Sequence, residues 1–462
     1  MPLIIAANRE PIQRQEDGSW QPSVGGLTSA LLPVLEERGG AWVAWGEDDI
    51  EQQSVLHYPP GDPKFHVSRL ELSEDEVQNY YYGFSNRVLW PLCHYFNEQL
   101  DIQHEYWESY LEVNHRFAQA IVREHQPGDL IWVQDYHLML VPALVRDLLP
   151  EARLGFFFHI PWPAPEEWAV LPWARELLAG LLGANLLGFH TERYCKNFLG
   201  AARELLDARV EGNTVHWEGR EVRVEPHPIG IDTARFEELA AQEEVREASR
   251  QIREEAGGEY LLLGVDRLDY TKGVPERLLA FEHFLENNPD FRGKVTFYQI
   301  SAPSRTRIDS YQELKRSVDE IAGRINGAYM EGEWVPVRYL YRSHNQDELV
   351  AYYLAADALV VTPFRDGMNI VAQEFALTSE KGLLILSHLT GVSEVLDGAL
   401  LVNPYDVVSI SEAIREAVRT PIPTRKEQLQ GLREQVYELD VHRWAGGFLA
   451  SLELEREGGG SP

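Results

Sequence analysis

Ten apolar runs of strand length recur along the chain, and stretches of helical length separate them. The runs are PLIIAANR, AWVAWG, DLIWVQD, RLGFFFHIPW, NLLGFH, EYLLLGVDR, KVTFYQI, ADALVVTP, LLILSH and ALLVNP. Their hydrophobicity is continuous rather than alternating, as expected for a parallel sheet covered by helices on both faces. The stretch VGGLTSALLPVLEERGG (24–40) supports this, because it places apolar residues at helical spacing and ends on two glycines. The pattern predicts an α/β fold.

The apolar runs fall into two groups, and the segment PHPIGIDTARF (226–236) between them is rich in proline and glycine. Such a composition is typical of a hinge between domains. We therefore predict two Rossmann-like, doubly wound domains that face each other across a cleft, with ligands at the carboxyl ends of the strands. The first domain is assigned to residues 1–228 and the second to residues 229–437, and residues 457–462 are predicted to form a disordered tail.

Charge and composition exclude several classes of partner. The chain of 462 residues has a formal net charge of −31, which opposes binding to nucleic acid or to anionic membranes. No apolar run approaches the roughly 20 residues of a membrane span, and the start MPLIIAANRE lacks the basic flank and cleavage site of a signal peptide. Cys93 and Cys195 are far apart and are expected to be reduced and structural. We expect a cytoplasmic location.

The common nucleotide-binding signatures are missing from the sequence. It contains no Gly-x-Gly-x-x-Gly after the first strand and no Gly-x4-Gly-Lys-Ser/Thr motif, so dinucleotide oxidoreduction and P-loop chemistry lose their main support. An Asp-x-Asp metal mount for a nucleotide-sugar diphosphate is also missing, and we expect no metal and no cofactor. A bound diphosphate would need side-chain cations and helix ends instead.

Two segments of the second half supply such groups. VDRLDYTKG places Arg267 at the end of a strand and Lys272 beyond a turn, so both cations can converge on one anion. FRDGMNIVAQEF (364–375) predicts a turn followed by a helix that begins near Met368 or Asn369, whose free N–H groups attract phosphate. The two segments together are therefore predicted to bind a diphosphate.

Glu374 lies between one and two turns into this predicted helix. A carboxylate there can accept paired hydrogen bonds from two sugar hydroxyls, as on a ribose, while Asp366 presents an oxygen beside the turn. The alternative for either piece alone is a solvated helix acid and an ordinary Asp-Gly turn. Their occurrence together with the two cations favours a ligand site.

These residues are similar to those of the trehalose-6-phosphate synthase family, retaining glycosyltransferases with the GT-B fold. The resemblance covers about residues 3–450 and rests on long stretches in the family's order, namely NR, GGL, WVAW, YYGFSNRVLWP, WVQDYHLMLVP, FFHIPWP, LLGFHT, PIGID, DRLDYTKG, RINGAY, RDGMN and LLVNPYD. It implies that the helix at about 438–456 crosses back onto the first domain.

The resemblance also implies the site residues. The donor site falls on Gly26, Arg267, Lys272, Asp366, Met368, Asn369, Ile370, Val371 and Glu374. The acceptor site, for glucose 6-phosphate, falls on Arg9, Trp42, Tyr81, Trp90, Asp135 and Arg305, with the two arginines gripping the phosphate. Arg267, Lys272, Asp135, Asp366 and His159 are the candidate catalytic residues.

Several of these residues also have plain structural readings. Asp135 follows the strand DLIWVQD, where it can orient sugar hydroxyls or simply end a strand. Trp42, Trp90 and Tyr81 offer flat faces to a sugar, but most aromatic residues of this kind are core. His159 follows RLGFFF and is more often a satisfied structural residue than a base; the resemblance implies contact with the donor sugar instead.

The resemblance implies transfer of glucose from a nucleotide sugar, most simply UDP-glucose, to glucose 6-phosphate with retention of configuration. Two alternatives stay open. ANREP and WVAW are similar to glucosylglycerol-phosphate synthases, which use glycerol 3-phosphate, and a non-catalytic sugar-phosphate sensor could share the fold. Gln373 replaces a lysine common in the family, which leaves the donor base (UDP, ADP or GDP) open. Small-molecule substrates are the expected partners, and association into a homo-oligomer is left open.

Overall fold

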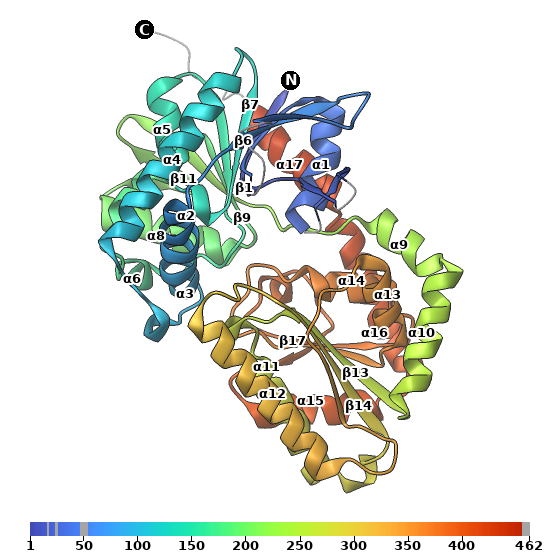
Figure 1. Ribbon diagram of the computed structural model, residues 1–462. Helices are drawn as coiled ribbons and strands as arrows, with labels where there is room; N and C mark the ends of the chain where they lie inside the picture. Colours follow the sequence, from blue (N-terminus) through green and yellow to red (C-terminus); the bar gives the residue numbers. More distant parts are fainter. Residues whose placement is uncertain (16–17, 24–25, 47–53, 455–462) are drawn as a thin grey trace. The chain divides into compact units, whose positions relative to one another are not determined.

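The computed structural model describes residues 1–15, 18–23, 26–46 and 54–454, and the predicted tail at 457–462 lies outside them. Two compact units make up the chain. Unit 1 comprises Met1–Pro228 and His442–Pro462, and unit 2 comprises Ile229–Val441. In the described ranges, no helix is both long enough and apolar enough to cross a membrane. Each unit is built on its own sheet (Figure 1).

The described part of unit 1 is organised around a 10-stranded sheet of order β10-β11-β12-β9-β8-β7-β1-β4-β6-β5. The pairs from β12 to β6 are parallel, and antiparallel strands flank them at both edges. From the central β1 the chain winds outward through β4 and β6, then returns to β7 and winds the other way. The strands are β1 (Leu3–Arg9), β4 (Gly40–Trp45), β5 (Val55–Tyr58), β6 (Phe65–Leu70), β7 (Leu130–Gln134), β8 (Arg153–Phe157), β9 (Leu186–Phe189), β10 (Arg209–Glu211), β11 (Thr214–Trp217) and β12 (Arg220–Pro226), and a hairpin of β2 (Ile12–Arg14) and β3 (Trp20–Pro22) stands apart.

The helices of unit 1 include one that comes from the far end of the chain. They are α1 (Gly26–Arg38), α2 (Glu74–Glu76), α3 (Trp90–Cys93), α4 (His104–Glu124), α5 (Val141–Leu148), α6 (Pro165–Trp168), α7 (Ala174–Leu181), α8 (Glu192–Leu206) and α17 (Val441–Glu453). On α17, the ring of Phe448 stacks on Trp132 of β7 at 4.5 Å. A Cβ atom on Gly155 or Gly188 would lie 2.7 Å from that ring, so glycine in β8 and β9 makes the room that Phe448 fills.

Unit 2 has an entirely parallel 6-stranded sheet among its described residues, of order β15-β14-β13-β16-β17-β18. The winding reverses between the neighbours β13 and β16, which is the switch point of a doubly wound sheet. The strands are β13 (Tyr260–Arg267), β14 (Val295–Ala302), β15 (Val337–Leu340), β16 (Ala358–Val361), β17 (Leu383–Ser387) and β18 (Leu400–Val402).

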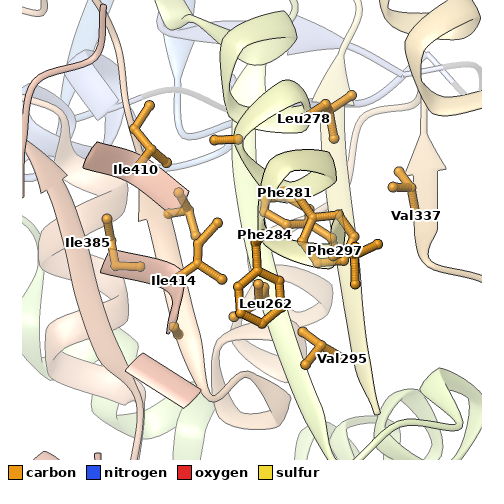
Figure 2. Packing of buried hydrophobic residues seen from close by; sticks show 14 of the residues in the cluster. Leu262, Leu278, Phe281, Phe284, Val295, Phe297, Val337, Ile385, Ile410 and Ile414 are labelled. Atoms are coloured by element: carbon orange, nitrogen blue, oxygen red, sulfur yellow. The ribbon is translucent and has the colours of Figure 1, made fainter. Parts of the chain in front are cut away.

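The helices of unit 2 form two groups, and the helices within each group contact one another. One group is α11 (Val274–Asn287), α12 (Asp309–Tyr329) and α15 (Val407–Arg419), and the other is α9 (Thr233–Ala241), α10 (Glu243–Ala256), α13 (Gln346–Ala355), α14 (Ile370–Thr378) and α16 (Ile422–Glu438). Figure 2 shows side chains of the first group, such as Phe281 and Ile414, packed with Leu262 and Phe297 of the strands. The predicted α/β class, with two doubly wound and largely parallel sheets, is confirmed.

Two segments at the ends of unit 2 lie side by side. The amide of Val441 donates to the carbonyl of Ile231 at 3.0 Å, and the Thr233 hydroxyl donates to Asp440 at 2.8 Å. Gly230 is packed so tightly that a Cβ atom there would lie 0.9 Å from the Leu439 carbonyl oxygen. The predicted hinge segment is therefore held to residues 439–441 by backbone contact.

This contact predicts a stability difference between two glycines of unit 2. Gly230→Ala should lower the free energy of unfolding by about 3 kcal/mol or more, because backbone atoms cannot move away as a side chain can. Gly323→Ala, inside α12 with nothing within 4 Å, should instead be neutral or stabilising by up to about 1 kcal/mol. Thermal unfolding of both variants decides this, and equal midpoints would contradict the close packing.

Candidate active site

The two motifs predicted in the second half meet at the switch point of unit 2. Arg267 is the exposed last residue of β13, and Lys272 follows in the 3-10 turn Tyr270–Lys272. Across the sheet, the segment after β16 carries Asp366. The Lys272 ammonium donates to the Asp366 carboxylate at 2.6 Å, and the two side chains are only 10% and 15% exposed. Residues 94 positions apart in sequence therefore share one ion pair.

Helix α14 begins at this ion pair. It starts at Ile370, just after the predicted start near Met368 or Asn369, with Asn369 as its N-cap in the left-handed region (φ 73°). The Asn369 amide donates to Asp366 at 3.0 Å, and its oxygen accepts from the Ala372 amide at 3.3 Å. The remaining first-turn amides of a helix form a ready site for an anion.

The turn before α14 is held by backbone hydrogen bonds from residues 391–392. Gly391 donates its amide to the Asp366 carbonyl at 3.1 Å, and Val392 donates to the Met368 carbonyl at 2.9 Å. A Cβ atom on Gly391 would lie 1.9 Å from the Gly367 carbonyl oxygen. Glycine at 391 is thus required for the turn that carries Asp366 and Met368 to sit where it does.

Glu374 is buried rather than solvated, which makes the alternative of an ordinary surface acid wrong. It is 9% exposed, and its Oε2 accepts a hydrogen bond of 2.7 Å from the hydroxyl of Tyr353, a residue of α13 that is 0% exposed. Burial raises the pKa of Glu374 to about 7, although the Tyr353 hydrogen bond acts in the opposite direction. The carboxyl group therefore titrates near neutral pH.

Gln373 does not extend toward the start of α14. Its side chain is 0% exposed, and its amide donates to the Ile229 carbonyl at 3.0 Å. The lysine that the sequence comparison expected here would also have to be accommodated against that carbonyl. In this chain Gln373 therefore joins α14 to the start of unit 2.

A buried guanidinium lies beneath the switch point. Arg277 of α11 is 0% exposed and donates to four acceptors, which lie on two strands and on the two segments that follow β13 and β16. They are Asp266 at 2.5 Å, Thr362 at 3.0 Å, Gln299 at 3.1 Å and the Lys272 carbonyl at 3.2 Å. Burial raises the pKa of Asp266 while Arg277 lowers it. Sequence reasoning missed Arg277, since an arginine inside a helix gives no signal of burial.

Arg305 follows β14 and is held by a buried carboxylate. Its Nη1 donates to Asp269 Oδ2 at 2.7 Å, its side chain is 5% exposed, and its backbone is left-handed (φ 44°). Burial by itself raises the pKa of Asp269, but Arg305, Arg267, the Thr271 amide and Lys272 lower it to about 2. Three predicted cations of unit 2 thus lie close to one permanently charged carboxylate.

In unit 1, three predicted acceptor residues come together near the end of β1. Arg9, the exposed last residue of β1, donates to the Tyr81 hydroxyl at 3.0 Å and lies 5.4 Å from the centre of its ring. Trp42 of β4 is 1% exposed and donates its indole N–H to the Arg9 carbonyl at 3.0 Å. Trp42 is therefore a core residue that fixes the backbone of Arg9.

Tyr81 is carried by a π-helix, Val77–Leu89, which the sequence did not predict. The Trp90 amide closes its last turn on the Ser85 carbonyl, and the Asn86 side chain donates to the Tyr81 carbonyl at 2.7 Å. Such wide turns are rare and frequently occur at functional sites. Trp90 itself is 4% exposed and lies against His94, with ring centres 4.2 Å apart.

Asp135 and His159 occupy the ends of the neighbouring strands β7 and β8. Asp135 has a left-handed backbone (φ 70°) and its Oδ1 accepts from the His159 amide at 3.1 Å. His159 Nε2 lies 2.9 Å from Gln134 Oε1, and burial, together with His190, lowers its pKa well below the usual value. The imidazole is therefore neutral, and its Nε2 donates to Gln134, so it is not arranged as a proton acceptor at that atom.

The other predicted positions have plain placements. Gly26 is the first residue of α1, and Ile370 and Val371 form the first turn of α14. Cys93 and Cys195 are both buried and not joined to each other. Among the residues that the structure describes, no group of three or more His, Cys, Asp or Glu side chains could hold a metal ion.

Comparison with known proteins gives one consistent family. The model of Glycosyltransferase family 20 matches residues 2–454. The trehalose-6-phosphate synthase of Mycobacterium avium is 40% identical, with 97% of this chain and 95% of that protein covered. A Burkholderia xenovorans alpha,alpha-trehalose-phosphate synthase (UDP-forming) in complex with glucose-6-phosphate is 33% identical with a TM-score of 0.90, covering 98% of this chain and 100% of that one. An E. coli structure bound with UDP-2-fluoro glucose is also 33% identical, has a TM-score of 0.91 and covers 98% and 99%. The chain therefore belongs to glycosyltransferase family 20.

Proposed function

We propose that this chain is a retaining glucosyltransferase that transfers glucose from UDP-glucose to glucose 6-phosphate and releases trehalose 6-phosphate and UDP. The observation that carries the proposal is the Lys272–Asp366 ion pair at the start of α14, with Arg267 on the adjacent strand end. Support also comes from relatives of full length, whose solved structures hold a UDP-sugar analogue and glucose 6-phosphate.

On the donor side, Arg267, Lys272 and the first-turn amides of α14 hold the diphosphate. Charge-assisted hydrogen bonds of this kind contribute about 1.5–3 kcal/mol each. Asp366 fixes the Lys272 ammonium, while the backbone around Met368 and Asn369 faces the glucose and phosphates. Glu374 accepts hydrogen bonds from the ribose hydroxyls through the oxygen opposite Tyr353.

On the acceptor side, Arg9 and Arg305 are assigned to the phosphate of glucose 6-phosphate. Tyr81 orients the guanidinium of Arg9, and Trp42 holds its backbone. Asp135 accepts from sugar hydroxyls, Trp90 packs behind the site, and His159 contacts the donor sugar as a neutral ring. Gly26 is assigned to the donor site.

The reaction breaks the bond between the anomeric carbon of the donor glucose and its diphosphate oxygen. The anomeric hydroxyl oxygen of the acceptor forms the new bond on the same face, and its proton passes to the departing diphosphate. Arg267 and Lys272 stabilise the negative charge that grows on the diphosphate as it leaves. Both substrates are phosphorylated sugars, and two buried thiols without a disulfide are in keeping with a cytoplasmic location.

The proposed activity has two alternatives, a transferase that uses glycerol 3-phosphate as acceptor and a sugar-phosphate sensor without turnover. We expect UDP release from UDP-glucose with glucose 6-phosphate and at least tenfold slower release with glycerol 3-phosphate. Turnover only with glycerol 3-phosphate would reject the proposed acceptor, and tight binding of both ligands without UDP release would favour the sensor. Assays with ADP-glucose and GDP-glucose fix the donor base.

Removal of either diphosphate cation should lower turnover sharply. Lys272→Ala and Arg267→Ala should each reduce kcat by about 100-fold or more, because both cations act on charge that develops in the transition state. Lys426→Ala on the exposed side of α16 is the charge-matched control and should keep the rate of the unmodified chain. Near-normal rates in the first two variants would place the diphosphate elsewhere.

Glu374 should make donor binding depend on pH. Below a pKa of about 7 its carboxyl group is protonated and neutral, and above it the group is ionised and accepts stronger hydrogen bonds from the ribose hydroxyls. Affinity for UDP-glucose, measured by calorimetry without acceptor, should therefore rise as the pH rises from about 6 to 8. Glu374→Gln should bind more weakly at high pH and show no such rise; an unchanged pH dependence in this variant would exclude Glu374 as its source.

A further inference from the structure

Asp269 lies at the centre of the predicted cations of unit 2 but has no role in the reaction described above. It is 0% exposed and follows β13, between Arg267 and Lys272 in sequence. A buried carboxylate is costly unless its oxygens are satisfied by hydrogen bonds or opposite charge. Asp269 accepts hydrogen bonds from Thr271, Arg305 and Tyr311, and the distribution of these bonds between its two carboxylate oxygens is the informative feature.

Oδ1 of Asp269 accepts hydrogen bonds from the segment that carries Lys272. It accepts from the Thr271 amide at 3.0 Å and from the Thr271 hydroxyl at 2.8 Å. Thr271 is 0% exposed and directly precedes Lys272. These two bonds shape the turn Tyr270–Lys272 and so set the direction in which the lysine side chain leaves the backbone.

Oδ2 of Asp269 contacts a different part of unit 2. It accepts from Arg305 Nη1 at 2.7 Å and from the Tyr311 hydroxyl at 2.8 Å. Tyr311, near the start of α12, is 3% exposed, and the same Arg305 Nη1 lies 2.5 Å from its hydroxyl oxygen. The carboxylate oxygen, the hydroxyl and the guanidinium form a closed triangle that holds an arginine whose backbone is left-handed.

We propose that Asp269 is a positioning residue that orients the donor-binding Lys272 through Oδ1 and the acceptor-binding Arg305 through Oδ2. The proposal rests on the proposed function, because that function assigns the two cations to different substrates. Charge supports it, since Arg305, Arg267 and Lys272 all stabilise the ionised carboxylate and are in turn held near it. In this proposal, Thr271 acts through Oδ1 on Lys272 and Tyr311 acts through Oδ2 on Arg305, so the two contributions can be removed separately.

The two contributions can be tested by near-isosteric variants that each remove one hydroxyl group. Thr271→Val removes a bond to Oδ1 and should raise the KM for UDP-glucose about tenfold, with the KM for glucose 6-phosphate within twofold of the unmodified value. Tyr311→Phe removes a bond to Oδ2 and should raise the KM for glucose 6-phosphate about tenfold and spare that for UDP-glucose. Asp269→Asn should raise both.

Tyr298→Phe is the matched control for loss of a buried hydroxyl. Tyr298 is 3% exposed, and its hydroxyl has no hydrogen-bond partner among the described residues, so both KM values should stay unchanged. A merely structural role for Asp269 would lower the unfolding temperature and affect both substrates alike. Opposite selectivity of Thr271→Val and Tyr311→Phe is not produced by general destabilisation.

Direct binding separates failure of the inference from failure of the proposed function. Calorimetry with UDP and, separately, with glucose 6-phosphate should show the same split between the two variants. If the unmodified chain binds both ligands without turnover, the proposed reaction fails while the split of affinities still decides the inference. Equal losses in both variants, no loss in either, or an unmodified chain that binds neither ligand would overturn it, even if Asp269→Asn fails to fold.

Discussion

The candidate donor site depends on the buried guanidinium of Arg277. It joins Asp266 and Gln299 on two strands to Thr362 and to the Lys272 carbonyl on the segments that follow β13 and β16. A Cβ atom on Gly264 would lie 2.7 Å from its Nη1, so β13 is built to admit it. Loss of one partner from such a buried pair costs about 3–5 kcal/mol, which is a large part of the stability of a domain. The two site-bearing loops are thereby held in one geometry.

A chain with a net charge of −31 must gather its few cations where an anionic substrate binds. Three cations near the switch point of unit 2 each form an ion pair with a carboxylate: Arg277 with Asp266, Lys272 with Asp366, and Arg305 with Asp269. These carboxylates fix the side chains before a ligand arrives, so less side-chain entropy is lost on binding. Preorganised charge of this kind is also what stabilises a leaving diphosphate.

Much of the fold could be predicted from the sequence, because its signals are local. Continuous apolar runs mark strands covered on both faces, and the Asp-Gly turn before Asn369 marks the start of α14. The sequence motifs also led to Arg9, which the structure places at the end of β1, and to Lys272 and Asp366, which it places in the segments that follow β13 and β16.

The parts that could not be predicted depend on contacts between distant segments. Tyr353 and Glu374 are on separate helices, and nothing in either segment shows that the acid is buried. The π-helix at 77–89, which buries Tyr80 and Phe84, was not predicted because its wide turns have no periodic signal of their own in the sequence. The sequence also contains no sign that Trp42, which is 1% exposed, donates its indole N–H to the Arg9 carbonyl.

The position of α17 has a consequence for synthesis of the chain. Its Phe448 fills the space over Gly155 and Gly188, yet the ribosome makes α17 only after all of unit 2. Domains generally fold as units during translation, from the N-terminal end. The sheet of unit 1 therefore stays incomplete during translation, because more than two hundred further residues are synthesised before α17 is available. Until then, Trp132 lacks its contact with Phe448. We expect the nascent chain to expose the apolar surface that α17 later covers, and chaperones bind surfaces of this kind.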